Sequence, residues 1–468
     1  MNGQIQDIGG IFAVVRAGTS FRPFVGALSD SMGRRRPILA CIALFAVGSA
    51  IGGSSINMAM LIAGMAVQGL GGCGISVLCQ ILVCDLVGLR RRAKYCGFIY
   101  GAATVGYSAG PVVGGLLVER AGWRWCYYIT LAPCGLAAIL VTLLLRVNHI
   151  PHSAREVFSR MDWRGNVIFV AACVSSVLAL GWAGTIHPWG SIEVLLPLLP
   201  GLAGFAGFVV YEAFAPFPML PPHMFRNRNF VASWTMSFAS GLGVLASSPA
   251  EAGVQYLPAV FATTFSALAG GQLLSKTGDY KSIHIVCAAI QTAGAGLMST
   301  LDERSPTAMW VVFRMIAGIG PGALGATVLP AAQAALSPSD VAKSAAALAF
   351  GQSLGSLWGL AVPAAVFNGR AQQLAHRVQD PIASRQLSGG QAYSRATKAF
   401  LDSLSVERGT RAQTVGVFVD SLRLVWYTQI GLSALCFVCL LEKRMHLGGG
   451  ESTDTSFGLK RRKPRIDA

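Results

Sequence analysis

The chain has 468 residues, of which 53% are apolar and only 12% are charged. Soluble domains carry about a quarter charged residues, so a soluble protein with one core is excluded. The net charge of +16 would point to nucleic acid in a soluble protein, but these basic residues lie in short stretches between apolar runs, where they orient a chain in the bilayer. We therefore expect contact with membrane lipid and no nucleic-acid partner.

Thirteen apolar segments are candidates for crossing the hydrocarbon core, which takes about 20 residues of helix. They are expected to be helices, because an open sheet would leave backbone groups unpaired in lipid, and the runs do not alternate as β-barrel strands do. The segments are 8–28, 37–54, 58–84, 95–118, 125–145, 165–184, 192–212, 230–245, 254–275, 282–300, 308–335, 344–367 and 421–441. The eighth would give only about 24 Å of helix, so it should thin the bilayer or continue into 247–251.

Basic residues favour one side of the membrane in this arrangement. Every second loop is basic, beginning with Arg34–Arg36 and Arg90–Lys94, which the positive-inside rule places in the cytoplasm. The short loops on the opposite side carry Arg120, Arg124 and Arg304. An odd number of segments places the N-terminus outside. Since many transporters consist of paired repeats, it also indicates that one helix is missing from the start.

The loop after the first segment reads GALSDSMGRRRP. Its Gly26, Asp30, Gly33, Arg34 and Arg35 match the loop signature G-x-L-[AS]-D-x-x-G-R-[RK], which resembles that of the major facilitator superfamily. The two glycines should allow a tight turn between helices, and Asp30 could pair with Arg34 or Arg35. We expect this group to act as a conformational switch; the alternative is an ordinary solvated loop.

The fourth segment contains a glycine pattern with one proline. Gly97, Gly106, Gly110, Pro111, Gly114 and Gly115 fit every fixed position of G-x8-G-x3-G-P-x2-G-G. This pattern resembles the antiporter signature of the same superfamily. Three of the glycines are four residues apart and form a stripe that lets helices approach closely, and the proline should bend the helix. Generic small-residue packing is the alternative.

Three polar residues in apolar segments are candidates for the substrate or proton path, namely Arg16, Gln68 and Arg314. An ionisable group inside the membrane usually faces a cavity or a partner, so structural pairing is the alternative for both arginines. For Gln68 the usual role of a lone buried glutamine, a hydrogen bond between helices, is the alternative. In the superfamily an arginine precedes this Gln-Gly pair in the third segment, where this chain has Met65. That departure puts the proton-carrying residue in doubt.

Nearly the whole chain resembles the fourteen-span drug:proton antiporter branch, especially its fungal members, which export drugs, toxins or secondary metabolites. Trp123-Arg124-Trp125 and the two central segments after Asp162 fit that branch. The family's first helix, with its aspartate, has no counterpart before Ile8. The resemblance therefore implies a major facilitator fold with its first helix missing.

The resemblance also implies a division of the chain. We expect an incomplete N-terminal helical bundle at 1–146 and a linker with two extra helices at 147–229. A C-terminal bundle at 230–441 should follow, with an outside loop at 369–420 and a basic cytoplasmic tail at 442–468.

The expected function is proton-coupled efflux of small, mostly apolar organic compounds, by a monomer in the plasma membrane or, alternatively, the vacuolar membrane. No metal-ligand spacing or nucleophile–base pair marks an enzyme, so we expect no catalytic residue, no metal and no cofactor, with the proton gradient as energy source. Two alternatives remain: a transport-inactive relative that binds ligands or partners, and a siderophore or amino-acid transporter of a sister branch. The residue pattern does not name the substrate.

Overall fold

The computed structural model describes residues 22–145, 162–183, 187, 189–216, 218, 220–246, 257–302, 305–337, 340–390, 392–396, 398–404 and 408–442. Regular structure in this part of the chain is helical, apart from an isolated bridge between Ala183 and His187. The long helices are α2 (Arg22–Met32), α3 (Arg35–Gly53), α4 (Met58–Leu86), α5 (Leu89–Arg120), α7 (Leu131–Leu144), α9 (Trp163–Trp182), α10 (Ile192–Phe214), α11 (Arg228–Ala246), α12 (Leu257–Thr277), α13 (Tyr280–Ser299), α14 (Thr307–Gln333), α15 (Val341–Leu374) and α19 (Arg408–Ala434). Shorter elements are α6 (Trp125–Tyr128), η2 (Pro222–Arg226), η5 (Ala375–Arg377), α16 (Pro381–Ser388), α17 (Ala392–Arg395), α18 (Lys398–Ser403) and η6 (Leu435–Leu441).

The expected all-α membrane fold is confirmed. Within the described residues, nine helices are long and apolar enough to cross a bilayer. Three more, α5, α11 and α15, have 32, 19 and 34 residues but are diluted by glycine, serine and charged residues. Helix α11 corresponds to the eighth segment and is longer than its apolar run 230–245. Its 19 residues reach about 28 Å at the usual rise. Of the first segment, the structure describes only the part from Arg22 onward, in α2.

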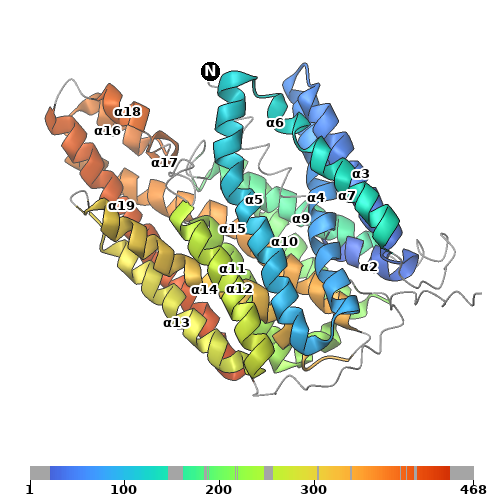
Figure 1. Cartoon of the computed structure of the whole chain (residues 1–468). Coiled ribbons are helices and arrows are strands. Elements are labelled where there is room, and N and C mark those ends of the chain that lie inside the picture. The colour runs from blue at the N-terminus through green and yellow to red at the C-terminus, as the bar shows by residue number, and fades with distance from the viewer. Residues whose placement is uncertain are drawn as a thin grey trace, which may run out of the picture.

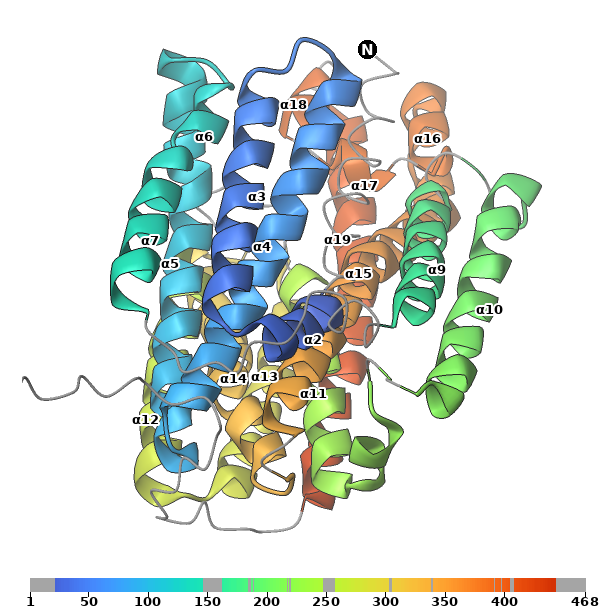
Figure 2. The same cartoon turned by 90° about the vertical axis from the view of Figure 1, so that its right-hand side faces the viewer.

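Two bundles face each other (Figures 1 and 2). Helices α3, α4, α5 and α7 pack together on one side, and α11 to α15 with α19 pack together on the other. Helices α9 and α10 pair with each other, and α9 reaches α15. Between the bundles, α5 packs against α12 and α14, while α2 and α4 pack against α15; Figure 2 shows α2 lying crosswise to α3 and α4. Two of the three less apolar helices, α5 and α15, thus lie at this junction together with the more apolar α4, α12 and α14.

The basic turns that the sequence placed in the cytoplasm lie at one end of the molecule. Arg90 in the first turn of α5 donates hydrogen bonds to the carbonyl oxygens of Ser275 and Lys276 near the end of α12. Lys281, in the first turn of α13, donates to the carbonyl oxygens of Leu440 and Glu442. Because these contacts join the ends of four helices, we call this the inner end and the opposite one the outer end.

The expected outside loop 369–420 is mostly helical. Helix α15 continues to Leu374, α19 already starts at Arg408, and η5, α16, α17 and α18 lie between them. We call residues 375–404 the outer cap. It has its own apolar core, in which Leu387 packs with Phe367 of α15 and Phe418 of α19. The sequence placed the last helix only at 421–441, because apolar runs mark only the part of a helix that meets lipid.

Candidate functional site

The loop signature forms a turn held by a buried ion pair. Gly33 has φ +78°, a backbone form that favours glycine. Arg34 follows it and is 2% exposed; its Nε lies 2.6 Å from Oδ2 of Asp85, near the end of α4. An NH1 of the same guanidinium donates to Oγ of Ser29 at 2.7 Å. The pair ties α2, α3 and α4 together, so this group is more than a solvated loop.

One expectation for this signature needs correction. Gly26 does not lie in the turn but inside α2, where an added Cβ would come within 2.8 Å of the Cβ of Ala346 on α15. Its lack of a side chain therefore permits helix contact rather than chain reversal. Arg35 points elsewhere and donates to the carbonyl oxygen of Thr142 near the end of α7. Asp30 lies in α2, and its side chain is outside the described part.

The antiporter pattern runs along α5 and divides it into two regions. At Gly97 an added Cβ would lie 2.7 Å from the carbonyl oxygen of Ala267 on α12. At Gly106, Gly110, Gly114 and Gly115 it would meet no described atom within 4 Å. Close helix approach is therefore found at Gly97 in the inner half of α5, whereas no described atom approaches the stripe of Gly106, Gly110 and Gly114 as closely. Pro111 lies in this outer half, and its side chain is outside the described part.

Gln68 lies inside the N-terminal bundle. Its Nε2 donates to Oγ of Ser49 on α3 at 2.9 Å, and the hydroxyl of Thr130 lies 3.0 Å from the same oxygen. Helices α3 and α4 touch at this point, because a Cβ added at Gly48 would come within 2.3 Å of the backbone nitrogen of Gln68. The arrangement is a hydrogen bond between packed helices, away from the junction of the two bundles.

Arg314 is 2% exposed within the outer half of α14. Its guanidinium carbon lies 5.8 Å from the ring centre of Trp310 and 5.9 Å from that of Trp426 on α19. Cation–π contact of this kind stabilises a buried cation. Arg314 therefore joins α14 to α19 and does not line the cavity between the bundles. Arg16 lies outside the described residues.

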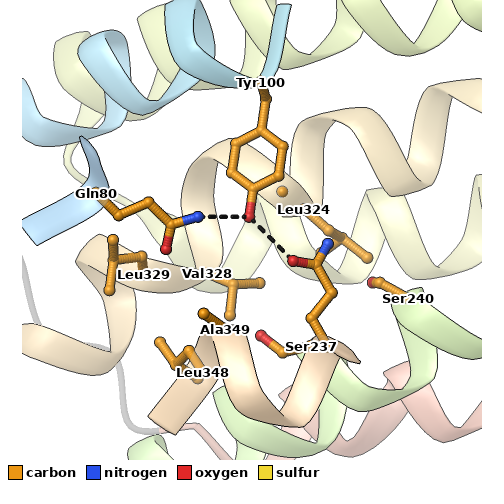
Figure 3. A pocket seen from close by; sticks show the side chains of 11 residues that line it. Gln80, Tyr100, Ser237, Ser240, Leu324, Val328, Leu329, Leu348 and Ala349 are labelled. Atoms are coloured by element: carbon orange, nitrogen blue, oxygen red, sulfur yellow. Dashed lines mark hydrogen bonds between the residues drawn. The ribbon is translucent and has the colours of Figure 1, made fainter. Parts of the chain in front are cut away.

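A small cavity lies where the two bundles meet (Figure 3). Nε2 of Gln80 on α4 donates to the hydroxyl of Tyr100 on α5, and that hydroxyl donates to Oε1 of Gln352 on α15. Both distances are 3.4 Å, which is long for a hydrogen bond. The cavity measures about 20 Å³, roughly the room that one water molecule needs. Its lining also includes Ser237, Ser240, Leu324, Gly325, Val328, Leu329, Leu348 and Ala349.

The chemistry of this lining is neutral. Apart from the Tyr100 phenol, no lining residue carries an ionisable side chain. Amides and hydroxyls that can both donate and accept alternate with aliphatic groups. Such a surface suits an uncharged molecule with a few polar atoms on an apolar frame.

Below the cavity, the inner end is closed by cations of one bundle that donate to neutral acceptors of the other. Arg22 donates to the carbonyl oxygen of Ala349 at 2.9 Å. Arg92, 6% exposed, donates to Oε1 of Gln333 at 2.9 Å. The Nε2 of Gln333 in turn donates to the carbonyl oxygen of Val341. With the Arg90 contacts, these bonds cross from α2 and α5 to α12, α14 and α15 without a carboxylate. They can break without leaving a buried, unpaired anion.

Sequence reasoning missed the cavity residues and these crossing bonds. Gln80, Tyr100 and Gln352 are uncharged polar groups inside spanning helices, and that property could have been searched for. The crossing bonds had no such signal, because most of their acceptors are backbone carbonyls. Asp85 lies against Arg34, the cation of the α2–α3 turn, although the basic run at Arg90–Arg92 is nearer in the sequence.

Comparison with known proteins agrees with this geometry. Residues 2–359 match the family described as the Major Facilitator Superfamily. The chain is 38% identical to the MFS efflux transporter aclA of Aspergillus oryzae over 94% of its length and 82% of that protein. It is 33% identical to the efflux pump FUS6 of Gibberella fujikuroi over 97% of its length and 85% of that protein.

Two solved structures resemble the fold. The proton:xylose symporter XylE bound to 6-bromo-6-deoxy-D-glucose has a TM-score of 0.53 and 14% identity over 90% of both chains. An auto-inhibited peptide transporter of the POT family has a TM-score of 0.51 and 16% identity, covering 87% of this chain and 88% of that one. At such identities the likeness concerns the arrangement of helices alone.

Proposed function

Because the chain belongs to the major facilitator superfamily and is a multi-pass efflux transporter, we propose that it exports small, mostly apolar, uncharged organic compounds in exchange for protons. The proton gradient is its energy source, and it needs no cofactor. It acts as a monomer in the plasma membrane.

The neutral cavity between the bundles carries this proposal. A cargo that contacts Gln80, Tyr100 and Gln352 meets donors and acceptors from α4, α5 and α15 at once. The two long hydrogen bonds leave the hydroxyl weakly held, so a polar atom of the cargo can replace one of its partners at small cost. No fixed charge in the lining selects a charged cargo.

The class of cargo is supported by one relative in particular. The MFS-type transporter of the acurin A biosynthesis cluster of Aspergillus aculeatus is 36% identical over 94% of this chain and 82% of that protein. A secondary metabolite of the producing cell is therefore the cargo that we propose. Export protects the producer and requires a site that can face either side of the membrane in turn.

The described arrangement is closed at its inner end and open along the outer half of α5. In the proposed cycle, breaking the crossing bonds of Arg22, Arg90 and Arg92 lets the bundles rock until the cavity faces the cytoplasm. Gly97 and its neighbours on α12 separate in that step, and the free glycine stripe at Gly106–Gly114 is the surface that closes outside. The loop signature stays intact within its own bundle.

Export from yeast cells lacking their own pumps tests the proposal. Acurin A serves as the probe, and a protonophore collapses the gradient. We expect lower accumulation that the protonophore abolishes. We also expect Tyr100→Phe to raise the half-saturating probe concentration about five-fold, the value of one hydrogen bond.

Tyr427→Phe, at an exposed position of α19, is the matched control and should change nothing. Export that ignores the protonophore would contradict proton coupling. An unchanged Tyr100→Phe variant would contradict the cavity as cargo site.

A further inference from the structure

A histidine and a glutamate meet inside the C-terminal bundle, away from the cavity. His284 lies one turn into α13, and Glu442 directly follows η6; both side chains are 0% exposed. The Nδ1 of His284 lies 3.0 and 3.2 Å from the two carboxylate oxygens. Its Nε2 lies 3.2 Å from Oγ1 of Thr327 on α14. The imidazole is thus held from both sides.

The neighbouring bonds determine how many protons the pair holds. The hydroxyl of Thr327 donates to the carbonyl oxygen of Ala323 at 2.8 Å, so its lone pair faces His284 and Nε2 must carry hydrogen. Nδ1 and the carboxylate would then repel each other unless one proton lies between them. Whichever atom carries that proton, the pair has no net charge, which is what a buried site without water favours.

The charged and ionisable groups around the pair do not replace that proton. The Nζ of Lys281 donates to the backbone oxygens of Leu440 and Glu442, not to the carboxylate. The ring centre of Tyr280 lies 5.9 Å from that of His284, and its hydroxyl accepts from Asn229 of α11. The other ionisable groups on α11, α13, α14 and η6 are the thiols Cys287, Cys436 and Cys439, together with Arg228 at the start of α11 and Arg314 in the outer half of α14. Helix α19 adds Arg408, Arg411, Asp420, Arg423 and Tyr427.

The segment before Glu442, η6, has an unusual backbone form. At its inner end α19 tightens into η6, a 3₁₀ segment of seven residues, whereas such runs seldom exceed three or four. Glu442 is held by the bond from Lys281 to its carbonyl oxygen, by the bond from its own N–H to the carbonyl oxygen of Cys439, and by the His284 pair. On the other side, Thr327 lies between Gly325 and Val328, which both line the cavity. The pair is therefore one helix away from the cargo site.

We propose that His284 and Glu442 form the proton-binding site of this transporter. This inference rests on the proposed proton-coupled export and names its carrier. In the arrangement described, the pair holds one proton. When the end of η6 leaves α13, Glu442 enters water as a carboxylate and His284 keeps only its Nε2 hydrogen. One proton then passes to the cytoplasm, and the balance is a neutral pair giving one carboxylate, one neutral imidazole and one proton.

Glu442→Gln separates proton binding from packing. The amide still donates to Nδ1 but holds no transferable proton. In proteoliposomes with acurin A as probe, an imposed pH gradient should accelerate export by the wild-type protein, and we expect Glu442→Gln to reduce this acceleration at least ten-fold. It should keep gradient-free exchange of the probe. The matched control is Glu193→Gln, the same change in the exposed first turn of α10.

Proton release gives a second measurement. When probe is added to the purified protein in weakly buffered detergent, the number of protons bound per protein molecule should change by about one. Glu442→Gln should abolish this change. A variant that keeps its gradient acceleration overturns the inference and leaves the proposed function intact. A Glu442→Gln variant that loses gradient-free exchange as well shows that the pair only fastens η6. That result also overturns the inference. A wild-type protein without gradient acceleration contradicts proton-coupled export itself.

Discussion

The two basic turns at the inner end, residues 30–36 and 276–281, share a backbone form and differ in how they are held. Gly33 and Gly278 have φ +78° and +73°, so both chains reverse through a left-handed glycine. In the first turn a buried arginine reaches across to the end of α4. In the second, Asp279 caps its own helix through Ser282, and Lys281 reaches the backbone after η6.

Two turns with the same backbone form can therefore have different roles. The ion pair of the first turn is nearly out of water, so it stabilises the bundle and resists change. The second turn uses local and partly exposed bonds, which leave the end of η6 easy to release. The N-terminal bundle is therefore expected to move as a rigid body, while the C-terminal bundle carries the element that changes.

Removing the buried cation should have the largest effect. Arg34→Ala removes the buried cation that faces Asp85, which should lower the free energy of unfolding by about 3–5 kcal/mol. Thermal unfolding in detergent, followed by tryptophan fluorescence, measures the loss. Arg35→Ala, which removes an exposed donor to a carbonyl, is the neighbouring control. If both variants melt alike, the two turns do not differ as we argue.

Replacing either glycine tests what the turns have in common. Gly33→Ala and Gly278→Ala each force a side chain into the left-handed region, at a cost of about 1–2 kcal/mol. The same melting experiment should show two similar shifts. Gly88→Ala is the control, because φ there is −58° and an added Cβ meets nothing within 4 Å. Clearly unequal shifts would mean that the shared backbone form is not what matters.

The cap of the second turn should have a smaller effect. Asp279 accepts from the backbone nitrogen of Ser282 at 3.5 Å and from its hydroxyl at 2.7 Å. Asp279→Ala should cost about 1 kcal/mol, whereas Asp279→Asn keeps a capping oxygen and should cost less. Equal losses for both would indicate that charge, and not capping, holds this turn.

The contact between the start of α5 and the second turn should give the smallest effect, on conformation rather than on stability. Arg90→Ala removes the bonds to Ser275 and Lys276 and should favour opening of the inner end by about 1 kcal/mol. Cys96, 1% exposed beside the α5–α12 contact, should then react with N-ethylmaleimide about five-fold faster. Mass spectrometry of the Cys96 peptide measures the rate. Arg91→Ala changes an exposed neighbour and should leave it unchanged.

The sequence allowed the helices and the first turn to be predicted, because apolar runs report contact with lipid and glycines mark left-handed backbone. It did not reveal the partner of Arg34, since Asp85 lies 51 positions away and had nearer basic neighbours. Tyr100 stands among antiporter-pattern glycines, yet its role follows from Gln352 on the other bundle. Nor did it indicate the outer cap, whose apolar residues are spread through a polar segment.

Helix α15 runs without a break from the inner end to the outer cap, about 51 Å at the usual rise. Near one end Ala346 touches Gly26, and at the other Phe367 is fixed in the core of the cap. A tilt of α15 that separates the contacts at the inner end must therefore also displace the outer cap. A fluorophore on Ile382, exposed in α16, would report from the outer end on the separation of contacts at the inner end.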